Sequence, residues 1–312
     1  MSPQSDTTKK QSREVTQKES VASSLLAGAI AGAIAKTTIA PLDRTKIYFQ
    51  VNHAPYSTKK ALKFMIQSYK TDGVISLWRG NSATMARIIP YAAIQFTAHD
   101  QWKHFLRVES NDKADENFLN LSSQVRRFLA GSLAGVTSQS LTYPLDLARA
   151  CMAVTRKDQY ASLSRVFAHL YKENGFLGLY KGYTPTILGI IPYAGASFFT
   201  YGTLKKHYIE KKGHTTFFEN LCFGAVSGVC GQTTSYPLDI IRRRMQTATA
   251  IGNKHFSMRE TIRNIYNLEG IRRGFFKGLS MNWIKGPVAV GVSFSTYDWA
   301  SSSIKKFVVT FT

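Results

Sequence analysis

The chain repeats one tripeptide three times, as Pro41-Leu42-Asp43, Pro144-Leu145-Asp146 and Pro237-Leu238-Asp239. A basic residue stands three positions after each aspartate, as Lys46, Arg149 and Arg242. Recurrence at a long, nearly fixed period is the sequence signature of a repeat protein, in which each copy forms one structural unit. The tripeptide therefore predicts three tandem units in this chain of 312 residues.

Two further features stand at nearly constant offsets from the three prolines. A Gly-x-x-x-Gly pair begins thirteen residues before each proline, as Gly28/Gly32, Gly131/Gly135 and Gly224/Gly228. An aromatic-basic-glycine triplet follows each proline, as Trp78-Arg79-Gly80, Tyr180-Lys181-Gly182 and Phe276-Lys277-Gly278. One such motif alone is a weak signal, but three copies of each in the same order leave little room for chance.

Apolar stretches of membrane-spanning length lie within these units. Gly182 to Leu204, Phe128 to Leu145 and Asn220 to Leu238 carry no charged residue, and each approaches the roughly 20 residues that cross a bilayer core. They are rich in small residues, which lower the mean hydropathy of the chain to -0.15 but permit close helix packing in lipid. The stretches therefore predict membrane helices.

Each unit is predicted to hold two spanning helices with a short amphipathic helix between them, for example over residues 57–69. The first helix packs through its Gly-x-x-x-Gly pair and kinks at its proline, and the second begins after the triplet. The predicted fold is an all-α membrane protein with six transmembrane helices. The repeats, of about 100 residues each, cover 21–112, 122–212 and 216–307, and residues 1–20 are predicted to be a polar, disordered tail.

Composition narrows the function. Forty Lys and Arg against nineteen Asp and Glu give a net charge of +21, which calls for an anionic partner: nucleic acid, lipid or a phosphorylated solute. A nucleic-acid-binding protein would gather its basic residues on one face or tail, whereas these recur at repeat-locked positions. The three cysteines have no metal-ligand or disulfide spacing, and no phosphate-binding or nucleophile motif is present. We therefore expect no enzyme, no cofactor and no metal.

The repeated motifs resemble the signature of the mitochondrial carrier family: Pro-x-Asp-x-x-Lys/Arg, then acid-glycine (Asp72-Gly73, Glu269-Gly270), then the triplet. The resemblance covers residues 21–306 and departs in the second repeat, where Asn174 replaces the acid. It implies a monomeric, six-helix, multi-pass protein of the mitochondrial inner membrane, with pseudo-threefold symmetry and a short matrix helix in each repeat. It also implies cardiolipin as a lipid partner and a central cavity that opens alternately to either side.

The resemblance further implies a gate on the matrix side. Charges at membrane depth are costly unless they are paired, and the expected pairs are Asp43–Arg149, Asp146–Arg242 and Asp239–Lys46. Gln50 and Gln246 match the family's brace position beneath this ring, where the second repeat has Ala153. Ordinary solvated pairs at helix ends are the alternative, but three copies in register favour the gate.

A second, thinner gate is expected at the cytoplasmic ends of the even-numbered helices. The family pattern there is aromatic-acid-x-x-basic, but Gly202 replaces the acid of the second repeat and Ser301 the base of the third. The surviving pairs would be Asp100–Lys205 and Asp298–Lys103.

Seven residues are candidate substrate contacts by the same resemblance: Lys36, Arg87, Gly189, Ile190, Tyr193, Arg243 and Lys285. Gly189-Ile190 resembles the nucleotide carriers, in which this pair leaves a slot for adenine, and the basic residues suit phosphates. Five of the seven have a plainer alternative. The glycine can serve helix packing, Tyr193 can be a wall residue, the lysines can pair with carboxylates, and Arg243 can meet lipid phosphates.

Whole passages are most similar to carriers of coenzyme A, among them residues 40–47, 77–85, 89–96 and 278–283. This likeness implies import of coenzyme A into the matrix in exchange for adenine nucleotides such as ADP or adenosine 3′,5′-diphosphate. Sibling carriers of ATP and ADP, of ATP-Mg and phosphate, or of thiamine pyrophosphate remain the alternative.

Overall fold

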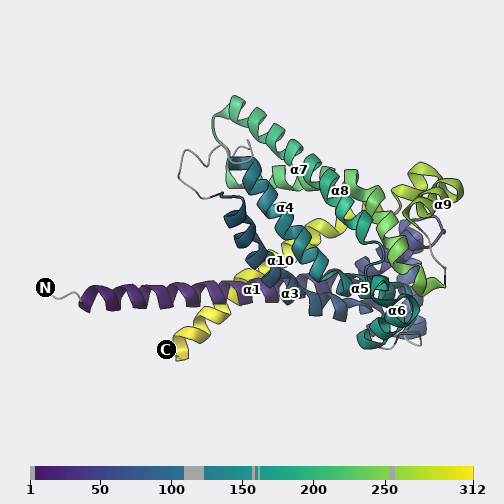
Figure 1. Cartoon of the computed structure of the whole chain (residues 1–312), viewed down its shortest axis with the longest axis horizontal. Helices are drawn as coiled ribbons and strands as arrows, with labels where there is room; N and C mark the ends of the chain where they lie inside the picture. The colour runs from purple at the N-terminus through teal and green to yellow at the C-terminus, as the bar shows by residue number, and fades with distance from the viewer. Residues whose placement is uncertain (1–3, 109–122, 157–158, 161, 253–256, 312) are drawn as a thin grey trace. The chain divides into compact units, whose positions relative to one another are not determined.

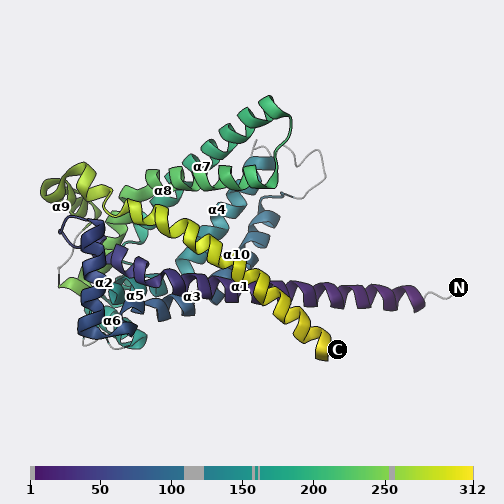
Figure 2. The same cartoon turned by 180° about the vertical axis from the view of Figure 1, so that it is seen from behind.

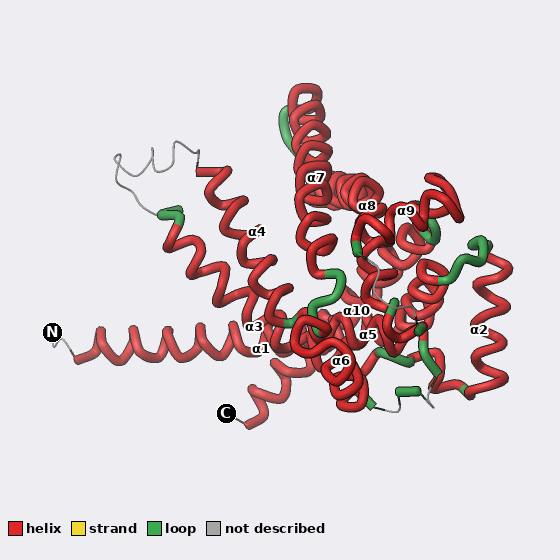
Figure 3. The backbone as a smooth tube through the Cα atoms, turned by 45° about the vertical axis from the view of Figure 1, so that its right-hand side comes forward, coloured by secondary structure: helices red, strands yellow, loops and turns green. Residues whose placement is uncertain are grey.

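The computed structural model describes residues 4–108, 123–156, 159–160, 162–252 and 257–311, and the regular elements in these ranges are all helical (Figures 1 and 3). The long helices are α1 (Gln4–Val51), α3 (Asn81–Phe105), α4 (Ser123–Leu141), α7 (Tyr183–Lys212), α8 (Phe217–Thr247) and α10 (Leu279–Phe311). The shorter elements are α2 (Thr58–Asp72), η1 (Val74–Trp78), α5 (Tyr143–Val154), α6 (Leu163–Gly178), η3 (Thr249–Ile251), α9 (Met258–Gly270) and η4 (Ile271–Phe275). The all-α prediction is confirmed.

The repeated prolines shape the first long helix of each repeat in different ways. Helices α1 and α8 continue through Pro41 and Pro237, whereas the second repeat breaks at Thr142 into α4 and α5, so that Pro144 lies in the first turn of α5. The first turn suits proline because the missing N–H has no intrahelical partner there.

A short helix follows in each repeat, bounded by the same two residue types. Its N-cap is a serine, Ser57, Ser162 or Ser257. In the third repeat Ser257 and Glu260 form a reciprocal capping box, with the Glu260 carboxylate accepting from the Ser257 amide at 2.9 Å. The glycine of each acid-glycine position has a positive φ, at Gly73, Gly175 and Gly270. This conformation turns the chain at the ends of α2 and α9 and kinks α6 at Gly175.

Residues 4–20 belong to helix α1, where the sequence predicted a disordered tail. Between Gln4 and Leu26 no proline or glycine interrupts the chain, and its Gln, Lys, Arg and Glu residues are good helix formers. The disordered tail was predicted from the polar, mixed-charge composition and the lack of an apolar stretch, and that composition is also compatible with a helix.

Among the described residues, helix α7 is the one element that is long and apolar enough, by length and composition alone, to cross a membrane. Its most apolar stretch of 18 residues has a mean hydropathy of 1.3.

The described chain divides into two compact units, a terminal unit (residues 1–40 and 284–312) and a main unit (residues 41–283). In the main unit, α7 and α8 run side by side (Figures 1 and 2). Gly231 of α8 makes this approach possible, because a Cβ there would lie 2.8 Å from the carbonyl oxygen of Tyr193. The Gly-x-x-x-Gly residues of α4 and α8 have no such neighbour within the unit, so their predicted role in helix packing is wrong. The motif alone predicted that these glycines contact another helix, but whether they do depends on which face of the helix meets its neighbour.

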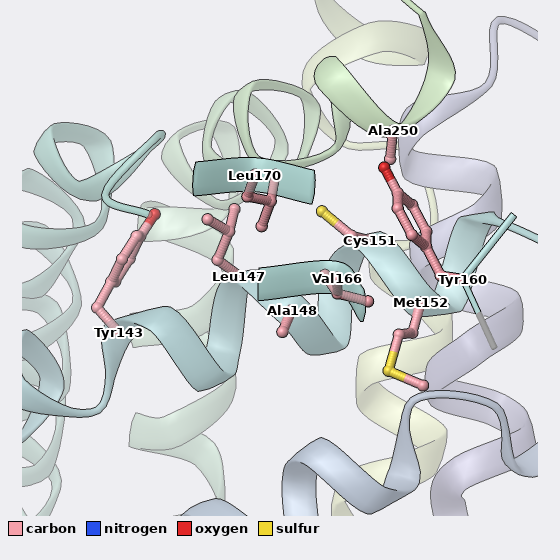
Figure 4. Close-up of a cluster of buried hydrophobic side chains, with 9 residues drawn as sticks. All are labelled: Tyr143, Leu147, Ala148, Cys151, Met152, Tyr160, Val166, Leu170 and Ala250. Atoms are coloured by element: carbon pink, nitrogen blue, oxygen red, sulfur yellow. The ribbon is translucent and has the colours of Figure 1, made fainter. Parts of the chain in front are cut away.

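The proline helices are anchored on the short helices of their own repeats. In the second repeat Tyr143, Leu147 and Cys151 of α5 pack with Val166 and Leu170 of α6 (Figure 4). In the third repeat Tyr236, Ile240 and Ile241 of α8 pack with Ile265 of α9. These buried faces orient the opposite faces of α5 and α8, which carry the charged residues described next.

Candidate functional site

Three ion pairs connect the proline helices of the main unit. The Lys46 ammonium lies 3.0 Å from Asp239, Arg242 lies 2.5 Å from Asp146, and Arg149 binds Asp43. Each aspartate pairs with the base of another repeat, and these are the pairings expected from the sequence. The six residues are called the ion-pair ring below.

Two buried glutamines brace the ring. Gln50 donates to Asp239 at 3.2 Å and to the hydroxyl of Tyr236 at 3.2 Å. Gln246 likewise donates to Asp146 at 3.0 Å and to the hydroxyl of Tyr143 at 3.1 Å. Gln50 and Gln246 are both fully buried, so these hydrogen bonds are shielded from water.

The tyrosines in these contacts were missed by the sequence analysis, although a signal was present. Tyr143 and Tyr236 each precede the repeated proline, and the first repeat has Ala40 at that place. The second repeat has Ala153 where the other two repeats have glutamine. By the order of the two existing pairs, Ala153 and Ala40 take the places of the glutamine and the tyrosine of a third pair, so both members of that pair are absent. Losing both members leaves no unsatisfied polar group behind, which is the cheaper change in a buried site.

The triplets fasten the second long helix of each repeat beside the ring. Tyr143 and Tyr236 donate to the carbonyl oxygens of Lys181 and Lys277, at 2.7 and 2.6 Å. The triplet glycines Gly80, Gly182 and Gly278 all have positive φ. A Cβ at Gly80 or Gly182 would also lie 3.0 Å from the carbonyl oxygen of the ring residue Arg149 or Arg242, so both backbone conformation and space require glycine.

The triplet bases bind the carboxyl ends of the proline helices in the same cyclic order as the ring. Arg79 donates to the carbonyl oxygen of Thr155 at 2.6 Å, after α5. Lys181 donates to the Thr249 hydroxyl at 2.7 Å, after α8, and Lys277 to the carbonyl oxygen of Asn52 at 2.8 Å, after α1. Cations are favoured at helix carboxyl ends, where unpaired carbonyl groups concentrate negative potential.

Asp146 is the most heavily bonded acid of the ring. Its carboxylate, in a residue 2% exposed, accepts from Arg242 at 2.5 Å, Arg87 at 3.1 Å, Arg243 at 3.3 Å and Gln246 at 3.0 Å. Arg243 also lies 3.9 Å from Asp239. The predicted substrate contacts Arg87 and Arg243 are thus bound to the ring in this conformation.

The site carries more cations than carboxylates. The ring itself is balanced, with three aspartates and three bases, and Arg87 and Arg243 add two positive charges. Arg87 is held by further contacts, from its Nε to the Thr142 hydroxyl at 3.1 Å and from its Nη2 to the Gln139 carboxamide at 2.6 Å. The guanidinium carbon of Arg87 also lies over the aromatic ring of Tyr91, 4.8 Å from its centroid.

The remaining predicted residues fall in both the main unit and the terminal unit. A Cβ added to Gly189 would lie 3.6 Å from the Cβ of Leu238. This glycine therefore faces α8, in agreement with the alternative that it serves helix packing. Tyr193 is 41% exposed, and Ile190 is partly buried. Lys36, Lys285 and Asp298 belong to the terminal unit, and their roles stay predictions.

The residues predicted to form the cytoplasmic gate differ in state from the ring. Within the described part of the main unit, Asp100 and Lys205 form no ion pair, and the Lys205 ammonium lies 5.8 Å from the centroid of the Tyr201 ring. The expected partners Lys103 and Asp298 fall in different units. The structure therefore has the ring formed and the Asp100–Lys205 pair apart.

A second charge cluster surrounds Glu269, the acid of the last acid-glycine pair. Its carboxylate is bound by Lys277 and Arg244, each at 2.5 Å, and by His53 at 2.8 Å, with a side chain 5% exposed. Burial alone would raise the pKa of this carboxyl, but the hydrogen bonds from Lys277 and Arg244 outweigh it and hold the pKa below its usual value. The cluster ties α9 to α8 and to the end of α1.

Replacing Glu269 by glutamine is expected to lower the melting temperature of the detergent-solubilised protein at pH 7.5. Removing one partner of a buried pair costs about 3 kcal/mol. Because the folded pKa lies below the unfolded value of about 4.3, the stabilisation is complete above that value and is lost as the pH falls through the folded pKa. The gap between wild type and variant should therefore narrow at pH 4.

The matched control is Glu173→Gln, whose side chain is 43% exposed beside His169 and should change little. Equal melting temperatures for wild type and Glu269→Gln at pH 7.5 would show that the cluster does not stabilise the fold.

Comparison with known proteins follows the same repeats. Three segments, residues 17–110, 121–212 and 213–307, match the family described as mitochondrial carrier protein. The chain is 52% identical over 299 residues to the mitochondrial coenzyme A transporter SLC25A42 of Danio rerio, covering 95% of this chain and 92% of the relative. The Homo sapiens protein of that name is 53% identical over 280 residues, covering 89% and 86%. Solute carrier family 25 member 16 of Mus musculus is 41% identical over 298 residues, covering 88% and 86%.

Proposed function

This chain belongs to the mitochondrial carrier family and is a transporter, and from that premise we propose that it exchanges coenzyme A for adenine nucleotides across the mitochondrial inner membrane. Relatives at 52% and 53% identity are named mitochondrial coenzyme A transporters, which supports the choice of substrate. The counter-substrates, ADP and adenosine 3′,5′-diphosphate, share an adenosine phosphate with coenzyme A.

The observation that carries the proposal is the surplus of two cations beside the balanced ring. Arg87 and Arg243 are not needed to neutralise the three ring aspartates, yet both lie at the ring. Retaining unneeded charge at membrane depth is costly, so a ligand that brings negative charge explains their presence. Coenzyme A carries three phosphate groups, and arginine binds phosphate through two parallel hydrogen bonds.

The same contacts suggest how binding is coupled to opening. With the ring formed, the matrix side is closed in this proposal, and Asp146 holds both surplus arginines. An incoming phosphate competes with Asp146 for Arg87 and Arg243, which removes two of the donors that stabilise the ring. The substrate thereby weakens the closed state through its differential affinity for the two conformations.

Other predicted contacts complete the proposed site. Ile190 and Tyr193 would provide the apolar wall for adenine, since Gly189 faces α8. Lys36 and Lys285 would bind further phosphates, Asp100, Lys103, Lys205 and Asp298 would close the cytoplasmic side, and the protein would act as a monomer bound to cardiolipin.

Uptake into proteoliposomes tests the function. The purified protein is expected to take up labelled coenzyme A when the vesicles contain ADP or adenosine 3′,5′-diphosphate, and only weakly when they are empty. Excess external thiamine pyrophosphate should compete poorly, because it lacks the adenosine that the site is proposed to hold.

Vesicles without protein provide the background. Rapid exchange of ATP or thiamine pyrophosphate with no uptake of coenzyme A would overturn the substrate and favour a sibling carrier. Equal uptake into empty and ADP-loaded vesicles would overturn antiport.

A further inference from the structure

Gln139 on α4 is placed beside Arg87 in a way that the family resemblance does not explain. Gln139 lies on the third long helix and is not among the seven substrate contacts expected from that resemblance. It stands just before the helix break at Thr142, in a stretch with no charged residue from Phe128 to Leu145. Its carboxamide oxygen accepts from Arg87 Nη2 at 2.6 Å.

This contact fixes which way the carboxamide points. A guanidinium only donates hydrogen bonds, so the oxygen of Gln139 faces Arg87 and the Nε2 group faces away from it. The Nε2 atom is buried, and no acceptor atom of the described residues lies within hydrogen-bonding distance. A buried donor without a partner destabilises the fold, and such groups are rare enough in folded proteins to require an explanation.

The two neutral neighbours of Gln139, Thr142 and Ser138, have hydrogen-bond partners, although the Nε of Arg242 beside Asp146 is also buried without one among the described residues. The Thr142 hydroxyl accepts from Arg87 and donates to the Ser138 carbonyl oxygen at 2.7 Å. The Ser138 hydroxyl has partners in Gln95 and Ala134. Gln139 is therefore the neutral member of this polar group that keeps an unused donor next to a surplus cation.

We propose that Gln139 is a further substrate-binding residue, whose Nε2 group donates to a phosphoryl oxygen of the ligand that Arg87 binds. The inference rests on the proposed function, because it requires a phosphorylated substrate at this place. Once the phosphate draws Arg87 from Asp146, the adjacent carboxamide supplies a second, neutral donor. A neutral donor adds specificity for the position of an acceptor oxygen without adding to the surplus charge.

The experiment measures coenzyme A exchange by Gln139→Leu, which removes the carboxamide at similar size. The KM for coenzyme A is expected to rise about 10-fold, as the loss of one hydrogen bond to a charged ligand predicts, while kcat stays within about twofold. Thr137→Val is the matched control: Thr137 lies on the same helix and accepts from Trp102 of α3 at 3.2 Å, and its loss should leave KM unchanged.

The Arg87→Ala background separates binding from positioning. If Gln139 contacts the ligand, Gln139→Leu raises KM further in that background. If Gln139 acts only by holding Arg87, the double variant has the KM of Arg87→Ala alone, and the proposal is overturned. A wild-type KM in the single variant would overturn it as well.

Thermal shifts distinguish this failure from failure of the proposed function. Wild-type protein in detergent is tested with coenzyme A, ATP and thiamine pyrophosphate, and whichever ligand stabilises it should stabilise Gln139→Leu less. If only thiamine pyrophosphate stabilises the wild type, the proposed substrate is wrong. The proposal for Gln139 then holds if thiamine pyrophosphate stabilises Gln139→Leu less than the wild type, and it is overturned if the two shifts are equal. If no phosphorylated ligand stabilises the wild type, both proposals are overturned.

Discussion

The Asp146→Asn variant is expected to lose at least about 100-fold of its coenzyme A exchange. Asparagine keeps the shape of the side chain but removes the charge that Arg87, Arg242 and Arg243 share. Leaving buried charges without their partner costs about 3–5 kcal/mol, which corresponds to a shift of about two to four powers of ten in the balance between the two proposed gate states. Initial exchange rates in ADP-loaded proteoliposomes provide the measurement.

Asp239→Asn serves as the comparison, because Asp239 is also a ring acid with a glutamine brace. It has Lys46 at 3.0 Å and Arg243 only at 3.9 Å, so its replacement should reduce exchange less than that of Asp146. Equal losses in the two variants would mean that the ring acts symmetrically and that the clustering of arginines on Asp146 has no energetic weight.

The second large effect is expected at Arg87. Arg87→Ala should raise the KM for coenzyme A by about 10- to 100-fold, since a charge-assisted hydrogen bond contributes about 1.5–3 kcal/mol. Arg87→Lys should fall between wild type and Arg87→Ala, because lysine keeps the charge and loses the planar fork that binds two phosphate oxygens. The KM and kcat of exchange are measured for each.

The double variant Arg87→Ala with Asp146→Asn tests whether the two residues act together. Removing the arginine also removes one of the uncompensated charges left by Asp146→Asn, so the double variant should lose less than the two single losses combined. Strictly additive losses would indicate that the 3.1 Å contact does not couple substrate binding to the ring.

Much of this protein's structure follows from its local sequence. The three Pro-Leu-Asp copies and their following bases predicted the repeats, because a fixed period imposes the same geometry on each copy. The three ring pairings were expected from the family resemblance that these copies carry. Serine before each short helix and glycine after it mark boundaries that depend only on neighbouring residues.

What the sequence misjudged are properties of faces and partners. Within the described part of the main unit, the Gly-x-x-x-Gly pairs of α4 and α8 have no close neighbour, whereas Gly231 does. The convergence of Arg87, Arg242 and Arg243 on Asp146, and the Gln–Tyr braces beside it, joins residues from different repeats. Such contacts are decided by how the helices rotate and pack. The order of residues along the chain specifies which groups are present in each helix, and only the tertiary structure determines which of them meet.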